Sequence, residues 1–246
     1  MANRLALAGK VALVTGGAIR LGRASALALA ESGADVAITY LKAAKEAKRT
    51  VKELEEFGVR SLDIHCDVTD GKNVDATITT IRKKFGGLDI LVNNAGAYET
   101  VSFENISLQR WDSIFATNVR GPFLLSQRAL PLLRARKGRI INLGSLGGVR
   151  AWAGHVHYCS SKAALHMLTK AMAKALAPKI SVNCVAPGMI DLGERITRTL
   201  MTDMASRTPM RRNGSGGDVA AAVLFFANAP KFITGQIMFV DGGLGL

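Results

Sequence analysis

The sequence has few cysteines, and none of them has the spacing of a metal site or a disulfide framework. Only three occur among 246 residues, Cys66, Cys159 and Cys184, and no two form a CxxC pair. An odd number of well-separated cysteines is typical of buried thiols in a reducing compartment. We therefore predict neither a metal nor a disulfide.

Long hydrophobic runs are also missing. The longest run, residues 219–227, is far shorter than the roughly 20 residues that a membrane-spanning helix requires. The first ten residues, MANRLALAGK, contain no apolar segment followed by a cleavage site. These absences predict a soluble, cytoplasmic protein that does not bind a membrane.

Acidic residues are scarce compared with basic ones. The 19 Asp and Glu residues face 32 Lys and Arg residues, which gives a net charge of +13. Such a surface attracts a phosphorylated cofactor, an acidic carrier protein or thioester, or nucleic acid. Nucleic acid is the least favoured of these partners, because aromatic residues are few (6%) and do not interleave with the basic ones as a single-strand platform requires.

Short apolar runs alternate with helical patterns along the whole chain. The predicted strands are 11–16, 35–39, 61–66, 88–93, 139–144, 180–187 and 236–240, and the predicted helices cover about 21–32, 43–57, 70–85, part of 108–136, 156–177 and 216–228. Continuously apolar strands between helices are typical of a parallel sheet that is buried on both faces. We predict one α/β domain over residues 1–246: a Rossmann-type, doubly wound parallel sheet of about seven strands with helices on both faces.

Residues 190–217 interrupt this alternation, since the segment is polar and lies between a strand and a helix. Segments of this kind in α/β enzymes often close over a substrate. We predict a substrate lid at 190–217. The methionines in and beside this segment, Met189, Met201, Met204 and Met210, could line an adaptable apolar pocket or pack within the lid itself.

The first strand runs into a glycine-containing turn and a helix, within VALVTGGAIRLG at 11–22. Glycines in such a turn allow a ligand to approach the backbone, and the amides of the following helix then face a pyrophosphate. The usual GxGxxG pattern is absent. The residues predicted to contact a dinucleotide here are Gly16, Arg20, Leu21 and Gly22.

The end of the second strand lacks an acid, because it reads ITYLKAAK at 38–45. An acid at this place would bind the ribose 2′-hydroxyl and repel a 2′-phosphate. Its absence, with Tyr40, Lys42 and Arg20 nearby, favours NADPH over NADH. Asp67, after the third strand, could accept a hydrogen bond from adenine or cap the next helix, and both alternatives stay open.

The segment HVHYCSSKAALHM at 155–167 places Tyr158 and Lys162 one helical turn apart. Hydride transfer to a carbonyl leaves charge on the oxygen, which then needs a proton. A nearby ammonium lowers the pKa of a tyrosine from about 10 toward the pH at which an acid catalyst works best. We predict that Tyr158 donates the proton and Lys162 tunes it, whereas His155 and His157 are polar loop residues.

Six matches in order along the chain resemble the short-chain dehydrogenase/reductase family: TGGAIRLG at 15–22, NNAG at 93–96, Asn118, Ser145, YCSSK at 158–162 and PG at 187–188. The resemblance implies that Ser145 binds the substrate oxygen and that Asn118 holds a water that resupplies the proton. It implies that Lys162 also binds the nicotinamide ribose. Further cofactor contacts are implied at Asp67, Val68, Asn93, Ala95, Gly96, Tyr158, Pro187, Gly188 and Ile190.

Two positions depart from the family pattern. Arg20 stands where the family commonly has glycine, a variant that resembles pteridine reductases. Leu192 stands where many members have a threonine that holds the nicotinamide carboxamide, so backbone atoms around Gly188 and Ile190 could serve instead. The family is commonly tetrameric, and the resemblance therefore implies a homotetramer that packs residues 108–136 and the Tyr158 helix against other copies.

The overall pattern is most similar to 3-oxoacyl-[acyl-carrier-protein] reductases, whose carrier is acidic and would suit a basic partner. Lys137 and Lys179 fall near positions that this subfamily uses for carrier docking. Arg20 and the segment LAPKISVN keep a pteridine or another small carbonyl open as the substrate. A nucleic-acid binder on an inactive enzyme fold would explain the charge, but not the set of Tyr158, Lys162 and Ser145.

Overall fold

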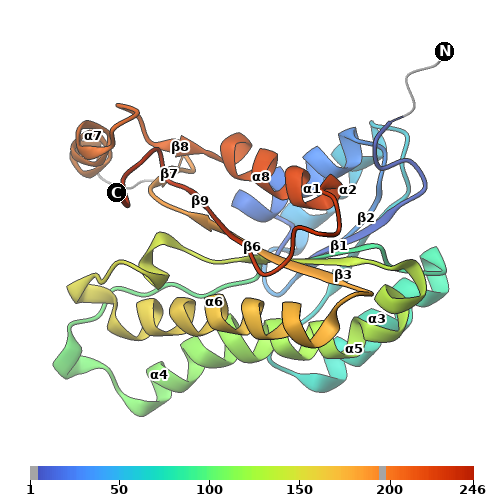
Figure 1. The fold of residues 1–246 in the computed structure, drawn as a ribbon, viewed down its shortest axis with the longest axis horizontal. Helices are drawn as coiled ribbons and strands as arrows, with labels where there is room; N and C mark the ends of the chain where they lie inside the picture. Colours follow the sequence, from blue (N-terminus) through green and yellow to red (C-terminus); the bar gives the residue numbers. More distant parts are fainter. Residues whose placement is uncertain (1–4, 194–197) are drawn as a thin grey trace.

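The computed structural model describes residues 5–193 and 198–246. Seven parallel strands form one sheet in the order β3-β2-β1-β4-β5-β6-β9 (Figure 1). They are β1 (Val11–Val14), β2 (Asp35–Tyr40), β3 (Ser61–His65), β4 (Ile90–Asn93), β5 (Arg139–Leu143), β6 (Ser181–Pro187) and β9 (Ile237–Val240). The predicted Rossmann-type sheet is thus confirmed. The strand order reverses between β1 and β4, where a doubly wound sheet leaves a crevice at the carboxyl ends of its strands.

Helices cover both faces of the sheet. Figure 1 shows α1 (Arg20–Glu31), α2 (Ala44–Glu55) and α8 (Gly216–Asn228) on one side, and α3 (Gly71–Phe85), α4 (Leu108–Phe115), α5 (Gly121–Arg136) and α6 (Val156–Leu176) on the other. Each layer has its own buried core: Leu29 and Phe226 belong to the first, Ile81 and Leu133 to the second. Apolar side chains on both faces of the central strands explain their continuously apolar sequences. The edge strand β3 instead alternates: Leu62 and Ile64 pack against the second core, and Asp63 and His65 are polar.

Local signals fix the ends of these helices. The Ser215 hydroxyl accepts a hydrogen bond from Asp218 N (3.2 Å), and the Asp218 carboxylate accepts one from Ser215 N (2.7 Å), which caps the start of α8. Helix α3 ends at Gly86, whose φ of +76° is in the left-handed region that favours glycine. Most predicted element bounds lie within two residues of those observed.

The long helical stretch predicted within 108–136 is divided in two. Between α4 and α5 the backbone widens into a π-helical turn, η2 (Ala116–Arg120). The Asn118 side chain in this turn bonds both the N–H and the carbonyl of Ala97. Single π turns inserted in helices often mark functional sites, and no feature of hydrophobic periodicity reveals them.

A small two-stranded sheet was not predicted from the pattern. Strand β7 (Ile190–Asp191) pairs with β8 (Gly214–Ser215), and α7 (Arg198–Arg207) lies between them in sequence. Figure 1 shows this unit at one end of the molecule, beyond the seven-stranded sheet. Two-residue strands are too short to show an alternating pattern. The predicted lid includes residues 194–197, which lie outside the described residues.

Two predicted absences can be compared with the described part of the chain. None of its helices combines the length and apolarity that a membrane crossing requires. It also contains no group of three or more His, Cys, Asp or Glu side chains arranged to hold a metal ion.

Candidate active site

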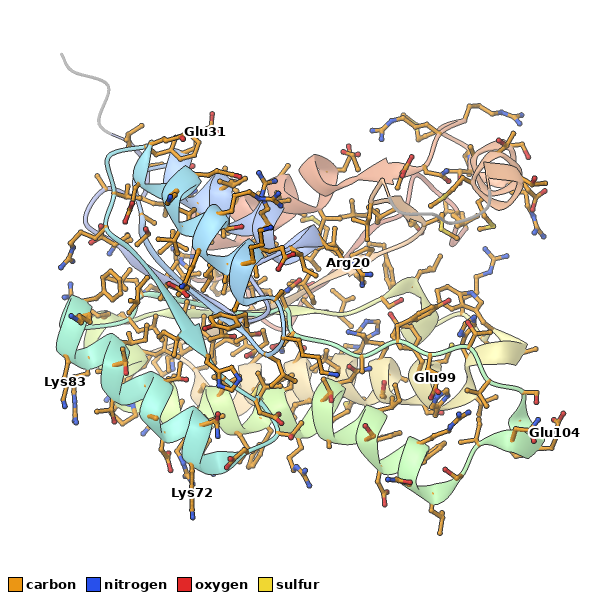
Figure 2. The ribbon with its side chains drawn as sticks, turned by 180° about the vertical axis from the view of Figure 1, so that it is seen from behind. Arg20, Glu31, Lys72, Lys83, Glu99 and Glu104 are labelled. Atoms are coloured by element: carbon orange, nitrogen blue, oxygen red, sulfur yellow. The ribbon has the colours of Figure 1, made fainter. Side chains whose placement is uncertain are left out.

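A cleft of about 1570 Å³ lies at the carboxyl ends of the strands, where the strand order reverses. One end is lined by the turn after β1 and the end of β2. The other is lined by the segments after β4, β5 and β6 and by part of α7. In Figure 2 the labelled Arg20 lies at the start of α1, above the loop that carries Glu99.

Hydrogen bonds between strand ends hold the turn after β1 in place. Asn94 Nδ2 donates to the carbonyls of Thr15 (2.8 Å) and Gly16 (3.1 Å), and Gly16 N donates to Thr39 Oγ1 (3.1 Å). Gly16 itself has a φ of +61°. A Cβ on Gly22 would stand 2.2 Å from the Gly16 carbonyl oxygen, so the start of α1 packs against this turn with no space for a side chain.

The start of α1 fits a pyrophosphate. Helix α1 lies within the described part of the chain. Its N-cap residue, Ile19, makes no side-chain hydrogen bond to the helix, and its first turn contains no acidic residue. The first backbone N–H groups of a helix have no partner within the helix, and the helix dipole favours an anion beside them. Because this terminus borders the cleft, the residues present fit a dinucleotide there.

Most of the predicted cofactor residues line the cleft: Gly16, Arg20, Leu21, Gly22, Tyr40, Asp67, Val68, Ala95, Gly96, Tyr158, Pro187, Gly188 and Ile190. Three predicted cofactor residues do not. Lys162 is buried behind the catalytic residues, and the other two belong to the dinucleotide end. Lys42 is exposed beside the cleft, and Asn93 is buried beneath it, where Nδ2 donates to Ser126 Oγ (3.2 Å) and Asn142 Oδ1 (2.8 Å). The neighbouring Asn94, which the motif contains but we did not single out, lines the cleft instead.

The two alternatives for Asp67 can now be compared. Asp70, not Asp67, caps α3, since its carboxylate accepts a hydrogen bond from Lys72 N (2.8 Å). Asp67 Oδ1 accepts hydrogen bonds from the N–H (2.8 Å) and the hydroxyl (2.7 Å) of Thr69 while the residue borders the cleft. The capping alternative is therefore wrong.

The nicotinamide end differs from the family pattern in the way the sequence indicated. Leu192 and Ile190 line the cleft. Gly188 N already donates to Val240 O (3.0 Å), so this N–H is engaged within the sheet. Of the two backbone positions suggested as substitutes for the missing threonine, Gly188 can thus offer only its carbonyl.

The structure brings the four predicted catalytic residues together. Tyr158 lies in the first turn of α6, and Ser145 lies two residues after β5. Both line the cleft, close enough for the Ser145 side chain to influence the pKa of Tyr158. Lys162 is only 6% exposed; its Nζ donates to Leu143 O (2.7 Å) and lies 5.8 Å from the centroid of the Tyr158 ring. Asn118 Nδ2 donates to Ser161 Oγ (3.0 Å), whose hydroxyl donates to Tyr158 O (2.7 Å).

The side chain of Asn118 has no free N–H for a water. Its two Nδ2 hydrogens serve Ala97 O (2.9 Å) and Ser161 Oγ, and its Oδ1 accepts from Ala97 N (2.7 Å). Asn118 is 1% exposed and does not line the cleft. A water at this residue can therefore donate to the second lone pair of Asn118 Oδ1 or contact the main chain of η2, but it cannot accept from the side chain.

The expected lowering of the Tyr158 pKa is wrong in this structure. Burial raises the pKa of Tyr158 to about 12, and the hydrogen bond with Ser145 opposes this shift only in part. Burial also lowers the pKa of Lys162 to about 8. The ammonium faces Leu143 O and the tyrosine ring, and desolvation disfavours the charged form of both groups.

Aromatic side chains surround Tyr158, and sequence reasoning missed them. The Tyr98 ring meets the Tyr158 ring edge-on at 4.9 Å, and the Trp152 ring is nearly parallel to it at 6.3 Å. Tyr98 OH lies 3.1 Å from His155 Nε2, and both residues line the cleft. The only signal was that Tyr98 follows the NNAG turn, which the structure places opposite the start of α6.

The interpretation of His157 as a polar loop residue is also wrong. Its side chain is fully buried in α6, and Nε2 lies 3.3 Å from Glu99 Oε2. The Glu99 carboxylate also lies 3.6 Å from the guanidinium of Arg110. These contacts tie the loop after β4 to the start of α6, and so hold Tyr98 beside Tyr158.

Comparison with known proteins agrees with this geometry. The model of a family described as enoyl-(acyl carrier protein) reductase matches residues 17–245. The chain is 40% identical over 240 residues to a 3-oxoacyl-[acyl-carrier-protein] reductase of Staphylococcus aureus, covering 96% of this chain and 98% of that protein. The chain belongs to the short-chain dehydrogenase/reductase family.

Solved structures place it among the same enzymes. A short-chain dehydrogenase from Burkholderia cenocepacia in complex with NADP is 39% identical, with a TM-score of 0.92 over 99% of this chain and all of that one. A blue fluorescent protein from a metagenomic library in complex with NADPH is 34% identical, with a TM-score of 0.90 over 98% and 99% of the two chains. This short-chain dehydrogenase/reductase is an oxidoreductase that uses a nicotinamide cofactor.

Proposed function

We propose that this short-chain dehydrogenase/reductase reduces the ketone of a 3-oxoacyl thioester with NADPH. The observation that carries the proposal is that Tyr158 and Ser145 line the same end of the cleft, with Lys162 buried behind them and its Nζ 5.8 Å from the centroid of the Tyr158 ring. The 40% identity to a 3-oxoacyl-[acyl-carrier-protein] reductase supports the choice of substrate.

When bound, NADPH supplies the hydride, and the residues of this chain handle the charge and the proton. The Ser145 hydroxyl donates a hydrogen bond to the carbonyl oxygen, which stabilises the charge that develops there. Tyr158 then gives its proton to that oxygen. A tyrosine whose pKa is raised to about 12 is fully protonated near pH 7, so it holds the proton that the reduction consumes. Transfer of that proton requires the phenolate to be stabilised as it forms.

Lys162 and Asn118 help to reprotonate Tyr158 after it has given up its proton. The Lys162 ammonium, close to the ring, stabilises the phenolate left behind. A lysine whose pKa is near 8 can release and regain a proton near neutral pH. Asn118 fixes the loop after β4 through Ala97 and keeps η2 open for a water beside Lys162.

The preference for NADPH rests on the charges around the adenosine end. No acid follows β2, and Arg20 and Tyr40 line the cleft there, with Lys42 exposed two residues further on. A 2′-phosphate carries extra negative charge that cationic side chains favour and a carboxylate would oppose.

An acidic acyl carrier protein as the substrate's carrier fits the net charge of +13. Lys137 and Lys179 lie just before β5 and β6, at the edge of the sheet opposite Ser145. Lys231 Nζ donates to Lys137 O, and burial together with neighbouring cations that include Arg139 lowers the pKa of Lys231. Lys137 and Lys231 form a basic cluster at this edge. Because the edge faces away from the cleft, a carrier docked there does not by itself place its acyl group at Ser145 of the same subunit.

We also propose that residues 190–217 act as a lid. Met204, Arg207 and Pro209 of this segment, together with the preceding Met189, line the cleft. Met210 is 66% exposed and does not line the cleft, so only Met189 and Met204 of these methionines support the pocket-lining alternative. The homotetramer stays a prediction; the exposed apolar side chains of Leu108 on α4, Phe123 on α5 and Met167 on α6 support an interface on that face.

Spectrophotometric NADPH oxidation tests the reaction with acetoacetyl, crotonyl and carrier-bound 3-oxoacyl thioesters and with a dihydropteridine. We expect turnover of the 3-oxoacyl thioesters, none of the crotonyl thioester, and a preference for NADPH over NADH of more than about tenfold. The double variant Arg20→Ala, Lys42→Ala should lower that preference about tenfold while leaving NADH use unchanged. Turnover of the crotonyl thioester alone would overturn the choice of a ketone substrate.

A pteridine reductase is the second candidate. The rings of Tyr98 and Trp152 beside Tyr158 offer flat apolar surfaces that a planar heterocycle could contact. The dihydropteridine in the assay decides between the two candidates by comparison of kcat/KM values.

A further inference from the structure

One buried side chain behind the active site has no part in the roles assigned so far. His166 follows Tyr158 and Lys162 at four-residue spacing on α6, so the three side chains share one helix face. The residue is only 5% exposed. Its ring lies edge-on to that of Phe239 on β9 at 6.2 Å.

The ring of His166 fills the space beneath the turn that carries Ser145. A Cβ on Gly144 would stand 2.4 Å from His166 Nε2, and one on Gly148 would stand 2.5 Å from His166 Cε1. Neither glycine has a positive φ, so the backbone conformation does not require glycine at either position. The two glycines instead make room for the imidazole on both sides of Ser145.

The ring also makes a polar contact with that turn. Ser145 N donates to His166 Nε2 at 3.5 Å. The Ser145 hydroxyl accepts a hydrogen bond from Gly147 N at 3.1 Å, which leaves its own hydrogen for Tyr158 or a substrate. The backbone and the hydroxyl of Ser145 are thereby both held, and the imidazole is the anchor for the backbone.

His166 keeps the form that can accept this bond. Burial, followed by the charges of Lys162 and Lys170 on the same helix, lowers the pKa of His166 to about 4. From the other elements, the titratable side chain facing the ring is Cys184 of β6, whose thiol lies against Gly144, and burial raises the pKa of this thiol to about 12. The ring is therefore neutral near pH 7, with its proton on Nδ1.

Filling space alone does not account for a histidine here. Nδ1 is buried and, among the described residues, has no hydrogen-bond partner. A buried donor without a partner destabilises the folded protein, whereas a leucine would fill a similar volume without that cost. A leucine, however, would leave Ser145 N–H without its acceptor.

We propose that His166 is a positioning residue, whose neutral imidazole anchors the Ser145 backbone and so directs the Ser145 hydroxyl toward Tyr158 and the substrate oxygen. The inference rests on the proposed reductase function for the role of Ser145. His166 touches neither substrate nor cofactor. The residue acts through the turn between Gly144 and Gly148.

Two substitutions at His166 separate positioning from packing. His166→Leu keeps the volume and removes the acceptor, whereas His166→Gln places an amide oxygen near the position of Nε2. We expect His166→Leu to lower kcat about 10- to 100-fold with an unchanged Kd for NADPH, and His166→Gln to recover most of the loss. Equal kcat values for the wild type and His166→Leu, or equal losses in both variants, would overturn the proposal.

The pH–rate profile is the readout that a packing role would not move. Loss of the aligned Ser145 hydroxyl removes a hydrogen bond that lowers the pKa of Tyr158. The apparent pKa for alcohol oxidation should therefore rise by about 0.5 to 1 unit in His166→Leu. Thr169→Val is the matched control, since Thr169 is also buried in α6 but bonds Asn142 Nδ2 and Leu165 O instead of Ser145; it should leave that apparent pKa unshifted.

A measurement on the wild-type protein covers the case in which a variant fails to fold. Long-range ¹H–¹⁵N NMR, with the His166 signal assigned through its contact with the Phe239 ring, should show a neutral ring protonated at Nδ1 from pH 6 to 8. A ring protonated at Nε2 could not accept from Ser145 N and would overturn the proposal. This result does not depend on turnover, so it stands apart from the outcome of the substrate assay.

Discussion

The two ends of the cleft are built from different kinds of structure. At the dinucleotide end, backbone groups and glycines of the turn after β1 are held by side chains at the ends of neighbouring strands. At the substrate end, large side chains such as Tyr98, Trp152 and Met204 reach the cleft from loops and from α7. The first end is rigid and recognises what all dinucleotides share, whereas the second can vary from one relative to another without disturbing the sheet.

Tyr158 and Lys162 lie where the two ends meet. Burial disfavours the charged form of both side chains. It raises the pKa of Tyr158 and lowers the pKa of Lys162, so the neutral phenol and the neutral amine are both favoured. Such a pair is costly to folding, and groups with perturbed pKa values are typical of functional sites. The comparison of the two ends therefore predicts that substitutions here separate activity from stability.

The largest effect is expected from Tyr158→Phe. The substitution removes only the hydroxyl, so the proton donor is lost while the ring still packs against Tyr98 and Trp152. Turnover should fall about 1000-fold or more, and the affinity for NADPH should change less than about threefold. Steady-state kinetics and fluorescence titration measure the two quantities. Retention of a tenth of the wild-type turnover would show that another group supplies the proton.

Lys162→Met should also lower turnover, by about 100-fold. The same substitution should not lower the stability of the folded protein at pH 7. Burial lowers the pKa of Lys162 from 10.5 to about 8 in the folded protein, so the charged side chain opposes folding. The unfolded chain thus binds this proton more tightly, so wild-type stability is depressed below pH 8 and rises as the pH increases toward 10.5.

The free energy of unfolding of Lys162→Met at pH 7 should therefore equal or exceed that of the wild type, despite the lost hydrogen bond to Leu143 O. Between pH 7 and 9.5 the wild type should gain stability relative to the variant. Urea denaturation at both pH values gives the comparison. A variant much less stable than the wild type at pH 7 would contradict the cost assigned to the buried ammonium.

Gly22→Ala tests the rigidity of the dinucleotide end. The new Cβ would stand 2.2 Å from Gly16 O and 2.4 Å from Asn94 Nδ2, so backbone must move. We expect a loss of about 1–3 kcal/mol in stability and a 10- to 100-fold weaker Kd for NADPH.

Gly71→Ala is the control for this substitution. Gly71 begins α3, its φ is not positive, and a Cβ there would meet no atom within 4 Å. An alanine at such a place should leave NADPH binding unchanged and add about 0.4–1 kcal/mol of stability. If Gly22→Ala and Gly71→Ala weakened NADPH binding equally, the turn after β1 would not be held as tightly as its contacts indicate.

The two ends also differ in how far the sequence predicts them. The strands, their parallel order and the turn at Gly16 follow from local patterns, because apolar runs and glycine spacing are properties of neighbouring residues. Tyr98 and His166 escaped prediction, since their roles depend on contacts with α6 and with the Ser145 turn that only the folded chain creates.

The same distinction explains the error on Tyr158. Spacing places Lys162 near the phenol, but it cannot show that burial outweighs the charge or that Nζ donates to Leu143 O. Asn93 was likewise correctly assigned to a strand end, although alternation along β4 directs its side chain beneath the cleft and leaves Asn94 to line it.

The smallest effect is expected from Tyr98→Phe. The ring keeps its contact with Tyr158, and the lost hydrogen bond to His155 lies on a side chain that is 61% exposed, where water replaces it. The kcat/KM for the substrate should change less than about threefold. Tyr98→Ala, which also removes the ring, should raise the substrate KM about tenfold and leave the Kd for NADPH unchanged. If Tyr98→Ala weakened NADPH binding as much as substrate binding, the two ends of the cleft would be coupled, and the loop after β4 would have to be counted with the dinucleotide site.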